Sequence, residues 1–125
     1  MIYGIGTDIV AVARLRSMWE RHGEKVLDRL LAPSERADFE RAADKGRFLA
    51  KRFAAKEAFS KALGTGVRPP ATLTAMAVGH DELGKPVIEA YGQLEILLKN
   101  EKLTAHLSIS DEADYAVAYV ILERS

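Results

Sequence analysis

Three ionisable side chains stand where the surrounding sequence is apolar. Asp8 follows a short apolar stretch that contains two glycines, Glu57 lies within an otherwise apolar segment, and His106 sits between Ala105 and Leu107. A carboxylate withdrawn from water is costly unless it is paired or bound to a metal. These three residues are therefore the first candidates for chemistry.

Asp8 and Glu57 together suit a hard divalent cation. The chain has no cysteine, which excludes thiol catalysis, disulfides and cysteine-zinc sites. Magnesium takes oxygen ligands, commonly one or two carboxylates, and water and substrate phosphate complete its shell. Basic residues surround Glu57 in the sequence (Lys51, Arg52, Lys56 and Lys61). A metal together with basic groups indicates a phosphate site.

Each candidate also has a purely structural interpretation. Asp8 is a favoured residue type for capping a following helix. Glu57 and Lys61 are spaced for an ion pair one helical turn apart. A lone histidine within a strand is more often a hydrogen-bonded core residue than a catalyst. The Gly-x-Gly of residues 4–6 lacks the spacing of dinucleotide-binding and P-loop motifs.

The elements that must position these residues can be read from periodicity. Residues 47–63 contain no proline or glycine and many alanines, which predicts a helix. Its apolar residues occupy two sides, so we expect it to be central and buried, and Gly64 should end it. The first half is completed by a strand at 2–7, whose glycines suggest close backbone approach, and by helical segments at 12–22, 26–31 and 33–43.

The second half is predicted to be mostly strand. Residues 103–110 and 115–122 should form an antiparallel hairpin around the polar turn 111–114. The other elements are strands at 72–78 and 87–90, separated by the turn Gly84-Lys85-Pro86, and a short helix at 92–99. The fold class is therefore α+β, with helices packed on an antiparallel sheet.

Bulk composition narrows the function classes. The 125 residues, 48% hydrophobic and 29% charged, fit a single domain over 1–125. Lys plus Arg and Asp plus Glu number 18 each, so no basic excess indicates nucleic-acid binding. No signal peptide is apparent, and no stretch approaches the roughly 20 apolar residues of a membrane span. We therefore expect a cytoplasmic protein without a nucleic-acid or membrane partner.

Four sequence blocks carry a resemblance to a known family. They are Gly4-Ile5-Gly6-Thr7-Asp8-Ile9-Val10, the run Arg52-Phe53-Ala54-Ala55-Lys56-Glu57-Ala58-Phe59-Ser60-Lys61-Ala62-Leu63-Gly64-Thr65-Gly66, the loop Gly84-Lys85-Pro86, and His106-Leu107-Ser108-Ile109-Ser110-Asp111. In order and spacing they resemble the bacterial holo-acyl-carrier-protein synthases, the small members of the 4'-phosphopantetheinyl transferase superfamily. The resemblance extends over nearly the full length.

The resemblance implies a role for each matching residue. Asp8 and Glu57 match the magnesium ligands, with manganese as the alternative ion, and Lys61 matches a lysine near the phosphates. The positions that match the coenzyme A site are Arg52, Lys61, Gly64, Gly84, Pro86 and His106. Two positions depart from the family: Ala32 replaces the usual threonine or serine at a helix entry, and Leu83 replaces an asparagine that contacts the nucleotide.

The reaction implied by the resemblance is transfer of 4'-phosphopantetheine from coenzyme A to a serine of apo-acyl carrier protein. Adenosine 3',5'-bisphosphate leaves, and the activity supports fatty acid biosynthesis. The serine proton has three candidate acceptors, namely Lys61, a metal-bound water and a carboxylate of the metal site. Whether the carrier serves fatty-acid or polyketide synthesis stays open. The alternatives are a non-catalytic module that binds coenzyme A or the carrier, and a structural trimer with a stabilising metal.

The resemblance also implies partners for the chain. It predicts a homotrimer with active sites at the subunit boundaries. A small domain has little room to bury coenzyme A by itself, although a dimer would answer that argument equally well. Arg14, Met18 and Arg21 share one helix face, which in the family docks the acidic carrier. A solvated face is the structural alternative.

Overall fold

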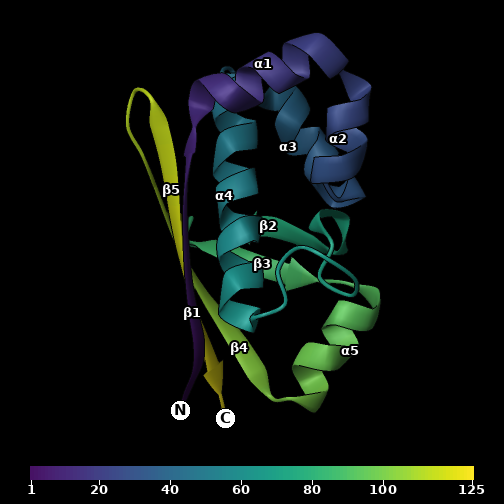
Figure 1. Cartoon of the computed structure of the whole chain (residues 1–125), viewed down its shortest axis with the longest axis vertical. Coiled ribbons are helices and arrows are strands. Elements are labelled where there is room, and N and C mark those ends of the chain that lie inside the picture. Colours follow the sequence, from purple (N-terminus) through teal and green to yellow (C-terminus); the bar gives the residue numbers. More distant parts are fainter.

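A 19-residue helix, α4 (Lys45–Leu63), runs along the sheet in the computed structural model, which describes all residues 1–125 (Figure 1). The helix begins where the Asp44 side chain accepts a hydrogen bond from the backbone N–H of Arg47 at 3.0 Å. It ends at Gly64, whose φ of 91° is a left-handed conformation that suits glycine. Its residues are buried on several sides, which confirms the predicted central helix.

Three antiparallel strands form the sheet beside α4, in the order β1, β5, β4. They are β1 (Ile2–Ala11), β5 (Tyr115–Arg124) and β4 (Leu103–Asp111). The predicted hairpin between β4 and β5 is confirmed. β1 is longer than the predicted 2–7, because its pairing with β5 continues to Ala11, opposite Tyr115.

Two glycines let β1 lie directly against α4. A Cβ atom placed on Gly4 would be 1.9 Å from the carbonyl oxygen of Ala62, and one on Gly6 would be 1.9 Å from that of Ala58. No side chain fits at such distances. The predicted close backbone approach is therefore confirmed, and it brings the strand that carries Asp8 onto the helix that carries Glu57.

Short helices surround the end of α4 at which α1 crosses it (Figure 1). They are α1 (Val12–His22), α2 (Glu24–Leu30), the 3-10 turn η1 (Pro33–Glu35) and α3 (Arg36–Arg41). Gly23, with φ 54°, separates α1 from α2. The helical segment predicted over 33–43 is confirmed over 33–41, although it opens as a 3-10 turn and ends two residues earlier, where Ala42 becomes extended.

The remaining elements form a hairpin and one more helix. The segment 72–78, predicted as a strand, begins with the 3-10 turn η2 (Leu73–Ala75), in which the Ala75 N–H bonds to the Thr72 carbonyl at 3.1 Å. The strand β2 (Met76–His80) therefore starts later, and it pairs with β3 (Pro86–Ala90) before α5 (Gly92–Asn100). The α+β class is confirmed, and no helix is long and apolar enough to cross a membrane.

Candidate active site

Asp8 lies on the face of the sheet that meets α4. It stands opposite Ala118 in the pairing of β1 with β5, and its side chain is 17% exposed. The interpretation of Asp8 as a helix cap is wrong, because β1 continues past it and α1 starts only at Val12. A mid-strand carboxylate with this little exposure needs a partner.

Lys61 supplies that partner. Its Nζ donates to Asp8 Oδ1 at 3.1 Å and to the Thr7 carbonyl oxygen at 3.0 Å. The ion pair that sequence spacing suggested between Lys61 and Glu57 is not the one that forms. The lysine reaches across to the neighbouring strand, so a contact between elements replaces the contact within the helix.

Glu57 is a partly buried carboxyl group beside Asp8. Burial raises its pKa, the negative charge of Asp8 raises it further, and the charges of Lys61 and Arg14 oppose the rise. A carboxylate whose charge is disfavoured by burial and by a second carboxylate is a donor that a divalent cation stabilises. Magnesium takes one or two protein carboxylates, so the residues present fit that ion. No cluster of three or more potential metal-binding side chains exists in the chain.

Of the four basic residues near Glu57 in the sequence, Lys61 lies beside it, whereas Lys51, Arg52 and Lys56 point elsewhere. Lys56 is fully buried and bonds to Glu35 at 2.6 Å, and burial lowers the pKa of this lysine while Glu35 opposes that effect. Arg52 also points to Glu35, at 3.0 Å. Lys51 lies 3.8 Å from Asp111. The expectation of a basic shell around Glu57 was therefore wrong for these three residues, because adjacent residues of a helix face different directions.

Arg52 nevertheless also lines a hollow of the protein surface. The hollow has a volume of about 410 Å³ and is lined in part by Arg52, Arg47, Lys51 and His80.

Gly64, at the other end of α4, caps the helix through bonds from its N–H to the Ser60 and Lys61 carbonyls.

A second cluster gathers the remaining predicted residues. Pro86 and His106 line one hollow of about 610 Å³ together with Lys85 and Tyr119. Gly84 belongs to the adjoining turn, with φ 83°. His106 is 47% exposed, and its Nε2 lies 3.0 Å from Glu123 Oε1. The interpretation of His106 as a core histidine is therefore wrong.

The two clusters lie on opposite faces of the sheet. Side chains of directly paired residues point to the same face, and successive residues alternate. His106 stands opposite Ile121, which stands opposite Ile5 on β1. Ile5 and Asp8 differ by an odd number of residues, so His106 points away from α4 while Asp8 points toward it. One chain does not bring its own Asp8 and His106 together.

The face of α1 that was predicted to dock a carrier lies next to the carboxylate pair. The Arg14 guanidinium sits 5.4 Å from the centre of the Phe53 ring, one helical turn before Glu57. Met18 and Phe53 line a hollow of about 700 Å³, and Arg21 is exposed. Phe53 was not predicted as a site residue, although its spacing of four from Glu57 could have indicated it.

Comparison with known proteins places the whole chain in one group. Residues 4–120 match the model of the 4'-phosphopantetheinyl transferase superfamily. A protein of Dechloromonas aromatica (strain RCB) named holo-[acyl-carrier-protein] synthase is 80% identical over 125 residues, which is 100% of each chain.

Solved structures agree with this comparison. The crystal structure of holo-[acyl-carrier-protein] synthase from Neisseria meningitidis is 42% identical, with a TM-score of 0.95 over 99% of this chain and 100% of that one. A holo-(acyl-carrier-protein) synthase from Bacillus anthracis str. Ames, in complex with CoA (3',5'-ADP), is 36% identical, with a TM-score of 0.84 over 100% and 99% of the two chains. The chain therefore belongs to the 4'-phosphopantetheinyl transferase superfamily.

Proposed function

We propose that this chain, acting as one domain over residues 1–125, transfers the 4'-phosphopantetheine group from coenzyme A to a serine of apo-acyl carrier protein. The observation that carries the proposal is the meeting of Asp8, Glu57 and Lys61 between β1 and α4. The names of the relatives, and the complex of the Bacillus anthracis protein with CoA, support the same reaction. The proposal places this chemistry in the cytoplasm, in support of fatty acid biosynthesis.

Asp8 and Glu57 are the residues that would hold magnesium, or manganese in its place. The bound ion would neutralise charge on the pyrophosphate as the leaving group departs. Lys61 holds Asp8 through its ammonium group and adds positive charge beside the phosphates. Such preorganised charge is a large term in catalysis.

The bond changes follow from the substrates. The serine oxygen forms a bond to the phosphorus that bears pantetheine, and the bond from that phosphorus to the bridging pyrophosphate oxygen breaks. Adenosine 3',5'-bisphosphate leaves, and the serine proton passes to an acceptor. An ammonium group has no lone pair, so Lys61, which donates to Asp8 and to the Thr7 carbonyl oxygen, could act as the base only in its neutral form. Water and a site carboxylate are the other acceptors.

Coenzyme A would contact both clusters. Gly84, Pro86 and His106 would bind it through the 610 Å³ hollow on the outer face of the sheet. Lys61 and Gly64 would contact coenzyme A on the side of the carboxylate pair. Arg52 would contact it from the 410 Å³ hollow that this arginine lines.

A homotrimer would bring the two clusters together from neighbouring subunits. Within one chain they occupy opposite faces of the sheet. The outer face also exposes large apolar side chains, with Ile5 55%, Ile9 65% and Tyr119 51% exposed. An apolar patch of this kind favours an interface with another protein surface. Cyclic assembly repeats one asymmetric contact around the ring and closes without leaving a free patch.

The face formed by Arg14, Met18 and Arg21 would dock the carrier. Acidic partner helices suit a surface with arginines around an apolar centre. Arg14 also contacts Phe53 and contributes its charge to Glu57. A serine on a carrier bound there would therefore arrive close to the carboxylate pair.

Mass spectrometry of apo-carrier tests the proposed function. After incubation with the protein, coenzyme A and magnesium, we expect the carrier to gain one phosphopantetheine group while adenosine 3',5'-bisphosphate appears in equal amount. Binding of coenzyme A or carrier without this mass change would instead establish the non-catalytic binding module.

A further inference from the structure

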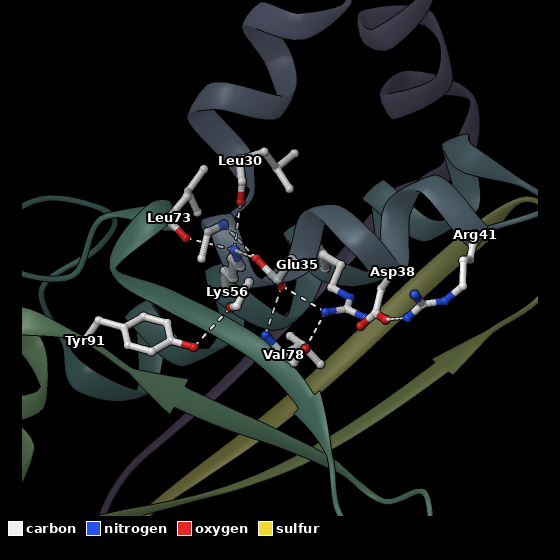
Figure 2. A network of polar contacts seen from close by, with 11 residues as sticks. Leu30, Glu35, Asp38, Arg41, Lys56, Leu73, Val78 and Tyr91 are labelled. Carbon is white, nitrogen blue, oxygen red and sulfur yellow. Dashed lines mark hydrogen bonds and ion pairs between the residues drawn. The ribbon is translucent and has the colours of Figure 1, made fainter.

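A buried ionic network surrounds Glu35 (Figure 2), and of its members only Arg52 is also assigned a contact with coenzyme A. It consists of Glu35, Lys56 and Arg52, which are 1%, 0% and 6% exposed; we call it the buried triad. Glu35 Oε1 accepts from Lys56 Nζ at 2.6 Å, and Glu35 Oε2 accepts from Arg52 at 3.0 Å. No buried side-chain polar atom of the protein lacks a partner.

The triad bonds to the backbone of four separate segments. Lys56 donates to the carbonyls of Leu30 at the end of α2, at 2.7 Å, and of Leu73 in η2, at 2.8 Å. Glu35 accepts from the Ala32 N–H at 2.9 Å, which caps the turn where the family more often has a hydroxyl residue. α4 is thereby joined to the end of α2, to the turn at η1 and to η2.

Two further hydrogen bonds of the triad fix the position of β2. Glu35 accepts from the Val78 N–H at 2.9 Å, and Arg52 donates to the Val78 carbonyl oxygen. Both backbone groups of Val78 therefore face the triad, at the edge of β2 away from β3. The side chains of Glu35 and Arg52 thus make the hydrogen bonds that a neighbouring strand would make to this edge of β2. A two-stranded hairpin is marginal by itself, so this edge contact fixes where the hairpin β2–β3 lies on α4.

Within one chain, the triad thus connects the segment that carries Glu57 with the hairpin that leads to Gly84 and Pro86. Lys56 immediately precedes Glu57 on α4, and Val78 leads through His80 into the turn that carries Gly84 and Pro86. A buried pair stabilises a fold little better than apolar residues of the same volume. Hydrogen bonds are directional, so those to the edge of β2 instead specify where β2 lies relative to α4.

We propose that Glu35, held by Lys56 and Arg52, is a positioning residue that sets the coenzyme A half of the site by fixing β2. The inference rests on the proposed function. It requires loss of the triad to weaken coenzyme A binding while docking of the carrier on α1 is retained. A role in stability alone would give no such separation.

The Glu35→Gln variant tests this, because it keeps the side-chain shape and places an amide N–H₂ among the donors of Val78, Arg52 and Lys56. We expect the KM for coenzyme A to rise about tenfold to a hundredfold, with kcat and the KM for carrier within about threefold of wild type. Hydrogen exchange of the Val78 amide, measured by NMR without substrates, should accelerate.

Two matched controls isolate the effect. Leu94→Ala empties a fully buried site on α5 and lowers thermal stability without touching the triad. Glu101→Gln removes an exposed ion pair with Arg124. Both should keep the wild-type KM for coenzyme A. Should Glu35→Gln fail to fold, Glu35→Asp carries the same test, because it keeps the negative charge beside Lys56 and Arg52 while its shorter side chain withdraws from the Val78 N–H.

The outcomes separate the inference from the proposed function. A wild-type KM for coenzyme A in the folded triad variant, or an equal rise in Leu94→Ala, overturns the positioning role while transfer itself stands. Absence of transfer by the wild-type protein overturns the proposed function. In that case the Val78 exchange rate still decides whether Glu35 fixes β2, and an unchanged rate would refute it.

Discussion

At the scale of single residues, the site depends on two carboxylates that face each other across a strand and a helix. Lys61 neutralises Asp8 at 3.1 Å, while Glu57 keeps a raised pKa from burial and from the charge of Asp8. The remaining unfavourable charge is what a divalent cation would relieve. Alanine at either position would remove a proposed metal ligand without emptying the core.

We expect Asp8→Ala and Glu57→Ala to lower transfer at least about a thousandfold and to remain folded by circular dichroism. Magnesium should raise the Tm of the wild-type protein, because a ligand bound only to the folded state stabilises it, and should leave the Tm of both variants unchanged. Glu95→Gln, an exposed carboxyl on α5, serves as the control. Normal turnover by Asp8→Ala would refute the metal assignment.

At the scale of elements, the contact of β1 with α4 brings these residues together. Gly6→Ala would place a Cβ 1.9 Å from the Ala58 carbonyl oxygen, and backbone cannot yield as a flexible side chain does. We expect a loss of about 3 kcal/mol or more in the free energy of unfolding. Gly23→Ala, where nothing lies within 4 Å but φ is 54° and ψ is −127°, should cost less, about 1–2 kcal/mol, and only through backbone strain. If urea denaturation gives both variants the same loss in free energy of unfolding, the contact between β1 and α4 is not the cause of the loss in Gly6→Ala.

The N-cap of α4, Asp44, should make stability depend on pH. The backbone N–H of Arg47, then the side chain of Arg16, lower the pKa of Asp44. A carboxyl whose pKa is depressed in the folded state adds stability above its unfolded pKa, and this is lost as pH falls through the folded pKa. Asp44→Ala should cost about 1 kcal/mol at neutral pH. The difference from wild type should shrink in acid, and a constant difference down to about pH 2 would contradict the cap.

The helix α1 can be tested through charge reversal. Arg21→Glu should raise the KM for carrier about tenfold at low salt and leave the KM for coenzyme A unchanged, because rim charges act on encounter. Arg21 is the cleaner position than Arg14, whose charge also reaches Glu57. The double change of Arg14 and Arg21 to glutamate should raise the KM for carrier further. Unaltered carrier kinetics at low salt would place the docking face elsewhere.

At the scale of the whole molecule, the opposite orientation of Asp8 and His106 predicts complementation. Glu57→Ala and His106→Ala subunits, mixed after dissociation and reassembly, should regain activity, with about a quarter of the sites intact for random mixing in a ring. Glu57→Ala mixed with Asp8→Ala provides the control, because both changes damage the same half. Equal activity in the two mixtures would refute sites shared between subunits.

The sequence by itself determined the elements and the type of chemistry. Alanine-rich, proline-free residues 47–63 predicted α4, the hairpin of β4 and β5 followed from alternation, and Gly4 and Gly6 predicted close approach. These features are local, since each depends on a residue and its near neighbours. The sequence blocks around Asp8 and Glu57 likewise indicated the family, which the comparisons confirm.

Only the tertiary structure decided which side chains meet. Lys61 bonds to Asp8 on a distant strand and not to Glu57 on its own helix. Lys56 and Arg52, interpreted from the sequence as part of a phosphate site, bond to Glu35 instead. His106 proved exposed on the face away from Asp8. Periodicity fixes the direction of a side chain within its element, whereas its partner depends on how distant elements pack.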